Sequence, residues 1–82
     1  MRVAVLAGGP SFERQVSIAG AERVVHALGE LGHKPLMIDV GRDLVAQLTD
    51  ARPEAAIIVL HGSVGEDGSV QAVLEGLGIP HQ

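Results

Sequence analysis

The chain alternates short, unbroken apolar runs with longer segments in which apolar residues recur every three or four positions. Unbroken apolar runs bounded by turn-forming residues are typical of strands that are covered on both faces of a sheet. Apolar residues at i, i+3, i+4 and i+7 instead indicate helices with one buried face. The patterns predict strands over residues 3–7, 34–40 and 55–60, and helices over 17–31, 43–50 and from 67 or 69 to 77.

Glycine, proline and small polar residues mark the expected ends of these elements. A Gly-Gly-Pro turn follows the first strand, so residues 8–16 are expected to form a polar loop. Ser17 is then the expected N-cap of the first helix, since serine side chains accept hydrogen bonds from helical N–H groups there. Gly32 and Gly78 are expected to stop the first and third helices. Residues 79–82 are typical of the start of a fourth strand.

The order of these elements predicts the fold. Strands that alternate with helices favour right-handed crossovers and a parallel sheet. We therefore expect one domain over residues 1–82, an open three-layer α/β/α parallel sheet of the Rossmann-like kind with element order β-α-β-α-β-α-(β) and strand order 2-1-3-(4). In this order the connections that follow strands 1 and 3 border the crevice where open α/β sheets bind ligands.

Composition and charge exclude several classes of function. The chain has 82 residues, 46% of them hydrophobic, which suits one small globular domain with an aliphatic core, since Phe12 is its one aromatic residue. A net charge of −4 with six scattered basic residues predicts no nucleic-acid binding. The chain has no cysteine and hence no disulfide or thiolate chemistry. No segment approaches the roughly 20 apolar residues of a membrane span, so no membrane association and a cytoplasmic location are expected.

The first polar connection offers a carboxylate beside the start of a helix. A dinucleotide-binding fingerprint would need glycine at positions 8, 10 and 13, but the sequence has Pro10 and Glu13 there. A Walker A motif is absent as well. Glu13 near a helix N-terminus suits a ligand with both a positive and a negative group, such as an amino acid. Alternatively, Glu13 and Arg14 are solvated loop charges whose only role is a weak surface ion pair.

The second polar connection, HGSVGEDG over residues 61–68, begins directly after the third predicted strand. His61 is therefore expected at the carboxyl edge of the sheet, and the glycines permit close backbone approach to a ligand. Glu66 and Asp67 precede a predicted helix, where acidic residues are favoured for structural reasons alone. A structural histidine is the alternative for His61. Neither a metal-binding spacing nor a nucleophile motif is present, so no metal site is expected in this chain.

Together the two connections resemble those of the D-alanine–D-alanine ligase family. Residues 61–72 (HGSVGEDGSVQA) are similar to the family's first signature, a dodecapeptide with many fixed positions. Residues 4–17 (AVLAGGPSFERQVS) look like the family's opening strand and loop. The final LEGLGIPHQ is similar to the segment that leads into the family's next strand. His81 departs from the family, where tyrosine is usual. The resemblance covers nearly all of this chain but only a minor part of a typical member.

The resemblance implies an ATP-grasp ligase that makes D-alanyl-D-alanine for peptidoglycan. In this family ATP phosphorylates the carboxylate of a first D-alanine, and the amine of a second one attacks the acyl phosphate. Carried over by motif, Glu13 would accept hydrogen bonds from the ammonium of the first D-alanine, and His61 would lie beside the same substrate. Gly9 and Gly62 would border the substrate.

Two further residues would support the substrate site without contacting the substrate. By the same resemblance Glu66 would orient His61, and Ser17 would support the first connection as a helix cap.

The same resemblance sets expectations for cofactors and partners. ATP and Mg²⁺ or Mn²⁺ would bind on later domains, so this chain is expected to hold neither and to be inactive alone. Its expected partners are D-alanine, the remaining ATP-grasp domains and a second subunit in a homodimer. A sister enzyme that joins D-alanine to D-lactate or D-serine stays open, as does a flavodoxin-like binding or interaction module without catalysis. A phosphoacceptor module is disfavoured because the first strand ends in Ala7-Gly8-Gly9, without an aspartate.

Overall fold

The sheet and helices follow in the alternating order that the sequence predicts. The computed structural model describes residues 1–9, 11–41, 43–60 and 68–82. Its elements are β1 (Arg2–Gly8), α1 (Ser11–Glu30), β2 (Lys34–Val40), α2 (Leu44–Ala51), β3 (Ala55–Ile58) and α4 (Ser69–Gly76). No helix among these residues combines the length and the apolar character needed to cross a bilayer.

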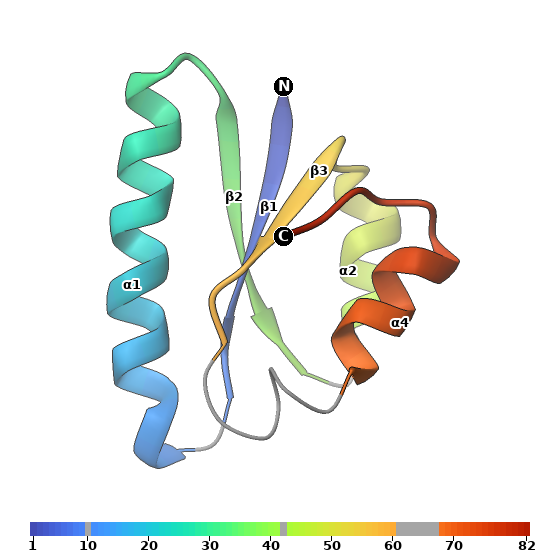
Figure 1. Cartoon of the computed structure of the whole chain (residues 1–82), viewed down its shortest axis with the longest axis horizontal. Helices are drawn as coiled ribbons and strands as arrows, with labels where there is room; N and C mark the ends of the chain where they lie inside the picture. Colours follow the sequence, from blue (N-terminus) through green and yellow to red (C-terminus); the bar gives the residue numbers. More distant parts are fainter. Residues whose placement is uncertain (10, 42, 61–67) are drawn as a thin grey trace.

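The three strands form a parallel sheet in the order β2-β1-β3, with β1 in the centre (Figure 1). β1 pairs with β2 from Arg2↔Lys34 to Gly8↔Val40. Beyond β3, His81 forms an isolated parallel bridge with Ala56. The chain end therefore lies beside β3, where the sequence predicts a fourth strand, and the order 2-1-3-(4) is confirmed.

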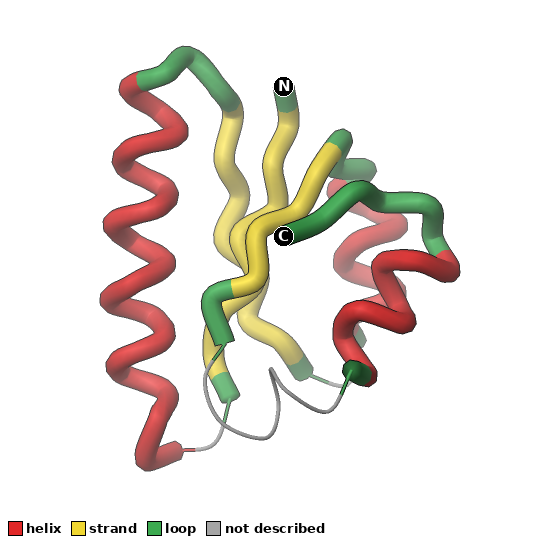
Figure 2. The backbone as a smooth tube through the Cα atoms, in the orientation of Figure 1, coloured by secondary structure: helices red, strands yellow, loops and turns green. Residues whose placement is uncertain are grey.

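Helices cover both faces of the sheet, α1 on one and α2 with α4 on the other (Figure 2). Successive β1 side chains point to opposite faces. Ala4 and Leu6 accordingly pack against α2 and α4, whereas Val5 and Ala7 pack with Ala21 of α1. Because each face of β1 contacts a helix, nearly the whole strand is buried, which explains its unbroken apolar run.

One boundary differs substantially from the prediction. α1 begins at Ser11, so the expected loop over residues 8–16 is wrong for most of its length, and Ser17 is not an N-cap. Residues 11–16 contain no helix breaker, and proline directly before them is compatible with a helix start. Smaller differences are that β3 ends at Ile58 rather than at residue 60, and that α2 begins at Leu44.

Candidate functional site

The candidate site lies where the carboxyl ends of β1 and β3 meet the N-terminus of α1. These two strands are direct neighbours, as the sequence predicts, so the segments that leave them start from the same edge of the sheet. Gly8 and Gly9 form the exit of β1 with φ angles of +114° and +102°, a region that favours glycine. This turn brings the chain into the first turn of α1 within a few residues.

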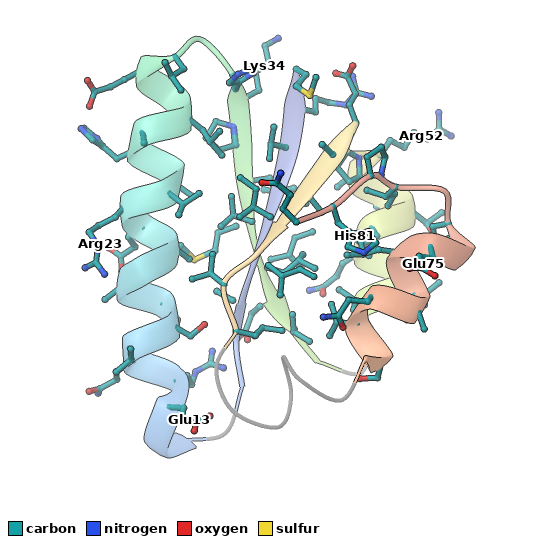
Figure 3. All side chains as sticks on the ribbon, viewed as in Figure 1. Glu13, Arg23, Lys34, Arg52, Glu75 and His81 are labelled. Atoms are coloured by element: carbon teal, nitrogen blue, oxygen red, sulfur yellow. The ribbon has the colours of Figure 1, made fainter. Side chains whose placement is uncertain are left out.

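Glu13 lies in that first turn, near the carboxyl end of β1 (Figure 3). Its side chain is half-buried, and its Oε2 atom is shielded from solvent with no hydrogen-bond partner among the described residues. A buried acceptor without a partner is unfavourable and uncommon in folded proteins. Glu13 therefore offers an oxygen that can accept a hydrogen bond from a ligand, and a cationic N–H group suits it best.

Ser17 follows Glu13 by one helical turn and lies on the same side of α1. Its side chain is fully buried. The Oγ atom accepts a hydrogen bond from the Gly8 N–H at 3.0 Å and donates one to the carbonyl of Val59. One hydroxyl thus joins α1 to the exits of both β1 and β3, a contact between distant segments that the predicted cap did not include.

A charged pair closes the other side of the β1 exit. Arg14 Nη1 donates to Asp39 Oδ1 at 2.9 Å, and Nη2 contacts Oδ2, so the guanidinium binds the carboxylate through both oxygens. The hydrogen bond from Arg14 holds the pKa of Asp39 below its ordinary value, and Asp39 raises the pKa of Arg14. Arg14 and Asp39 thus form an ion pair on the surface, as the alternative interpretation of Arg14 from the sequence allows.

Several candidate residues fall outside the described part of the chain. His61, Gly62 and Glu66 belong to this group, so the hypothesis that an imidazole and the Glu13 carboxylate share one pocket stays a prediction. Gly9 is described and half-buried, and no atom of the described residues lies within 4 Å of a Cβ atom built on it. Among the described residues, no three His, Asp or Glu side chains gather as metal ligands would.

A hollow in the surface lies next to this region. It has a volume of about 550 Å³ and lies between the outer strand β2 and α2. Its wall includes Leu36, Ile38, Asp39, Gln47 and Asp50. Asp39, the partner of Arg14, lines the hollow, whereas Glu13 and Ser17 do not, so the hollow adjoins the candidate site without including Glu13.

Comparison with curated proteins finds similarity to D-alanine–D-alanine ligases, although no family model matches the chain. The D-alanine–D-alanine ligase of Moorella thermoacetica is 48% identical over 81 residues, which are 99% of this chain and 26% of that protein. The Pseudomonas entomophila enzyme of the same name is 51% identical over 98% of this chain and 25% of its own length. The chain thus spans about a quarter of these curated relatives.

Solved structures agree with the sequence comparison. The crystal structure of D-alanine–D-alanine ligase from Bacillus anthracis complexed with ATP superimposes with a TM-score of 0.87 at 38% identity. The match covers 99% of this chain and 28% of that one. A second structure of the Bacillus anthracis enzyme gives a TM-score of 0.84 at 36% identity. The fold predicted from the sequence is therefore the fold of this segment in known proteins.

Proposed function

Because this chain is homologous to the N-terminal domain of D-alanine–D-alanine ligases, we propose that it is the domain of such a ligase that holds the first D-alanine. Similarity over nearly the whole chain, in sequence and in backbone, supports the proposal. The observation that carries the site assignment is the shielded Glu13 oxygen that has no partner among the described residues. An amino-acid ammonium supplies the charge-assisted N–H donor that this oxygen lacks.

In this proposal each candidate residue has a distinct task. Glu13 accepts hydrogen bonds from the ammonium and fixes the orientation of the substrate. Gly9 and Gly62 let the backbone approach the substrate closely, since neither carries a side chain. His61 lies beside the same D-alanine, and Glu66 orients the imidazole.

Ser17 has a positioning role rather than the capping role expected from sequence. Its two hydrogen bonds hold α1 to Gly8 at the end of β1 and to Val59 just after β3. Glu13 lies on the same side of that helix. Ser17 thereby supports the geometry of the substrate site without contact with the substrate.

ATP and its Mg²⁺ or Mn²⁺ ion fit poorly to the described residues. Glu13 places a negative charge in the first turn of α1, where a phosphate would need N–H groups and positive charge. Carboxylates do not cluster as a divalent ion requires in the described ranges. We propose that the nucleotide and the metal bind to other domains of the ligase; when bound, ATP supplies the phosphoryl group that activates a carboxylate. Homodimer formation and a cytoplasmic location, where ATP is abundant, are parts of the same proposal.

A domain exchange tests this function. The matching quarter of the Moorella thermoacetica ligase is replaced by this chain, and formation of D-alanyl-D-alanine and of inorganic phosphate is measured with varied D-alanine. We expect the exchanged protein to make the dipeptide with a D-alanine dependence similar to that of its parent. The parent without its N-terminal quarter is the control, and we expect it to be inactive.

The result that refutes the proposal is equally specific. An exchanged protein that is folded by circular dichroism and binds ATP like its parent, yet releases no phosphate with D-alanine, would contradict a ligase role. D-lactate or D-serine offered as the second substrate distinguishes the sister activities. If the exchanged protein forms a product with D-lactate or D-serine but none with D-alanine alone, the second substrate is that compound and not D-alanine.

A further inference from the structure

The first turn of α1 carries two charged side chains, Glu13 and Arg14, that are both half-buried. Ser17, one turn after Glu13, is fully buried, whereas Gln15 and Val16 are exposed. Glu13 lies beyond them, toward the helix start. Among the described side chains of this segment, Arg14 makes the one ion pair. Its partner Asp39 belongs to β2, the strand that pairs with β1.

We propose that the Arg14–Asp39 ion pair is a positioning device that fixes the first turn of α1, and thereby Glu13, over the exit of β1. This inference rests on the proposed function, since Glu13 matters as the acceptor for the substrate ammonium. Arg14 itself acts through Glu13 and needs no contact with substrate.

The geometry of the pair favours positioning. The two nitrogens of the Arg14 guanidinium bind the two oxygens of Asp39, which restrains rotation as well as distance. A single ammonium group acts as a point charge and would restrain distance alone. Arg14 follows Glu13 directly on the helix, so an anchor at Arg14 limits where the Glu13 Cα atom can lie.

The pair also packs directly on the turn that it is proposed to define. A Cβ atom built on Gly8 would collide with Asp39 Oδ1 and would lie 3.2 Å from Arg14 Nη1. Gly8 also donates its N–H to Ser17 on the α1 side. The exit of β1 is thus held between the ion pair and a buried hydroxyl, and the two contacts together define the helix start.

Solvent exposure separates positioning from global stability. The side chains of Arg14 and Asp39 are 40% and 53% exposed, and pairs this exposed contribute little to overall folding. We therefore expect loss of the pair to loosen the first turn of α1 while the sheet stays intact.

Amide hydrogen exchange of the 82-residue chain tests this expectation without any enzyme assay. In Arg14→Gln and Asp39→Asn, exchange at the amides of residues 15–17 should rise several-fold, while amides of β1 and β3 keep their parent rates. Glu54→Gln is the matched control, because it removes an exposed carboxylate that pairs with Arg2 near the opposite edge of the sheet. Unchanged exchange at residues 15–17 in both variants overturns the proposal.

Kinetics of the exchanged ligase then test the link to the substrate. Arg14→Gln and Asp39→Asn should each raise KM for the first D-alanine about tenfold, with KM for ATP unchanged. Their double variant should be no worse than either single one, because both break the same contact. Arg14→Lys should recover only part of the loss, since it keeps the charge without the two-pronged geometry.

The outcomes separate this inference from the proposed function. Faster amide hydrogen exchange at residues 15–17 with an unchanged KM for D-alanine would make the pair merely structural and overturn the positioning role. An exchanged protein that makes no dipeptide before any substitution refutes the proposed function and, with it, the substrate role of the pair. In that case the amide hydrogen exchange rates of the 82-residue chain still decide whether the pair fixes the helix start.

Discussion

Replacing Ser17 by alanine removes a hydroxyl that joins α1 to the segments that follow both β1 and β3. The side chain is fully buried and bonds the Gly8 N–H at 3.0 Å as well as the carbonyl of Val59. Alanine keeps the helix propensity but leaves both backbone groups without this partner. Gly8 is buried, so water cannot easily replace the lost acceptor.

The magnitude follows from the different surroundings of the two groups. A buried donor left without a partner costs about 1–3 kcal/mol, and loss of an ordinary hydrogen bond costs about 0.5–1.5 kcal/mol. Val59 is only half-buried, so the lower value applies to its carbonyl. We expect Ser17→Ala to lower the free energy of unfolding by about 2–3 kcal/mol. For a domain of this size such a loss lowers Tm by roughly 8–24 °C.

Urea unfolding followed by circular dichroism measures this loss, and an exposed threonine supplies the control. Thr49 donates its hydroxyl to the carbonyl of Val45 at 2.7 Å on the exposed side of α2. Thr49→Ala removes a hydroxyl-to-carbonyl bond of the same kind where water is available, so we expect a change below about 0.5 kcal/mol. Equal effects of Ser17→Ala and Thr49→Ala would refute the account of Ser17 as a buried link.

Three other predictions concern single backbone positions and pH. Gly8→Ala should lower stability by about 1–3 kcal/mol by urea unfolding, because its φ is +114° and the new Cβ collides with Asp39; an unchanged midpoint would contradict this. Arg52→Gly should raise stability by about 0.5 kcal/mol, since Arg52 has a left-handed φ of 49°, and a lower Tm would contradict the strain argument. Hydrogen bonds from Arg14 and Arg2 lower the pKa values of Asp39 and Glu54, so the unfolded chain binds more protons in acid. Their stabilisation is present above pH about 4 and is lost as pH falls through the folded pKa values. The double variant Asp39→Asn, Glu54→Gln should therefore lose less stability than the parent between pH 5 and 3. If the free energies of unfolding of variant and parent fall in parallel over this range, these two carboxylates are not the cause of the pH dependence.

The strands could be predicted from the sequence because their signals are local. The 34–40 prediction matches β2 at both ends, and the continuous apolar run over residues 3–7 follows from burial of β1 on both faces. Glycine marked the stops correctly as well, since Gly32 and Gly78 both have positive φ angles. Neighbouring positions of β1 and β3 followed from the usual order of such sheets.

The helix start and the polar contacts around it could not be predicted in the same way. A serine beside a polar stretch is typical of an N-cap, but Ser17 bonds groups that are 9 and 42 residues away in the chain. Arg14 and Asp39 are separated by 25 residues, and no local pattern connects them. Sequence placed Glu13 near a helix start correctly, yet it lies within the helix rather than in a loop before it.

The most direct test of the account compares two glutamates of α1 in the exchanged ligase. Glu13→Gln removes the charge of the proposed ammonium acceptor, and Glu22→Gln removes a charge from the exposed part of the same helix. A charge-assisted hydrogen bond contributes about 1.5–3 kcal/mol, so Glu13→Gln should lower kcat/KM for the first D-alanine roughly 10- to 150-fold. Glu22→Gln should leave it unchanged. Equal kcat/KM values for the two variants, in folded proteins that bind ATP equally well, would contradict the assignment of Glu13 to the substrate.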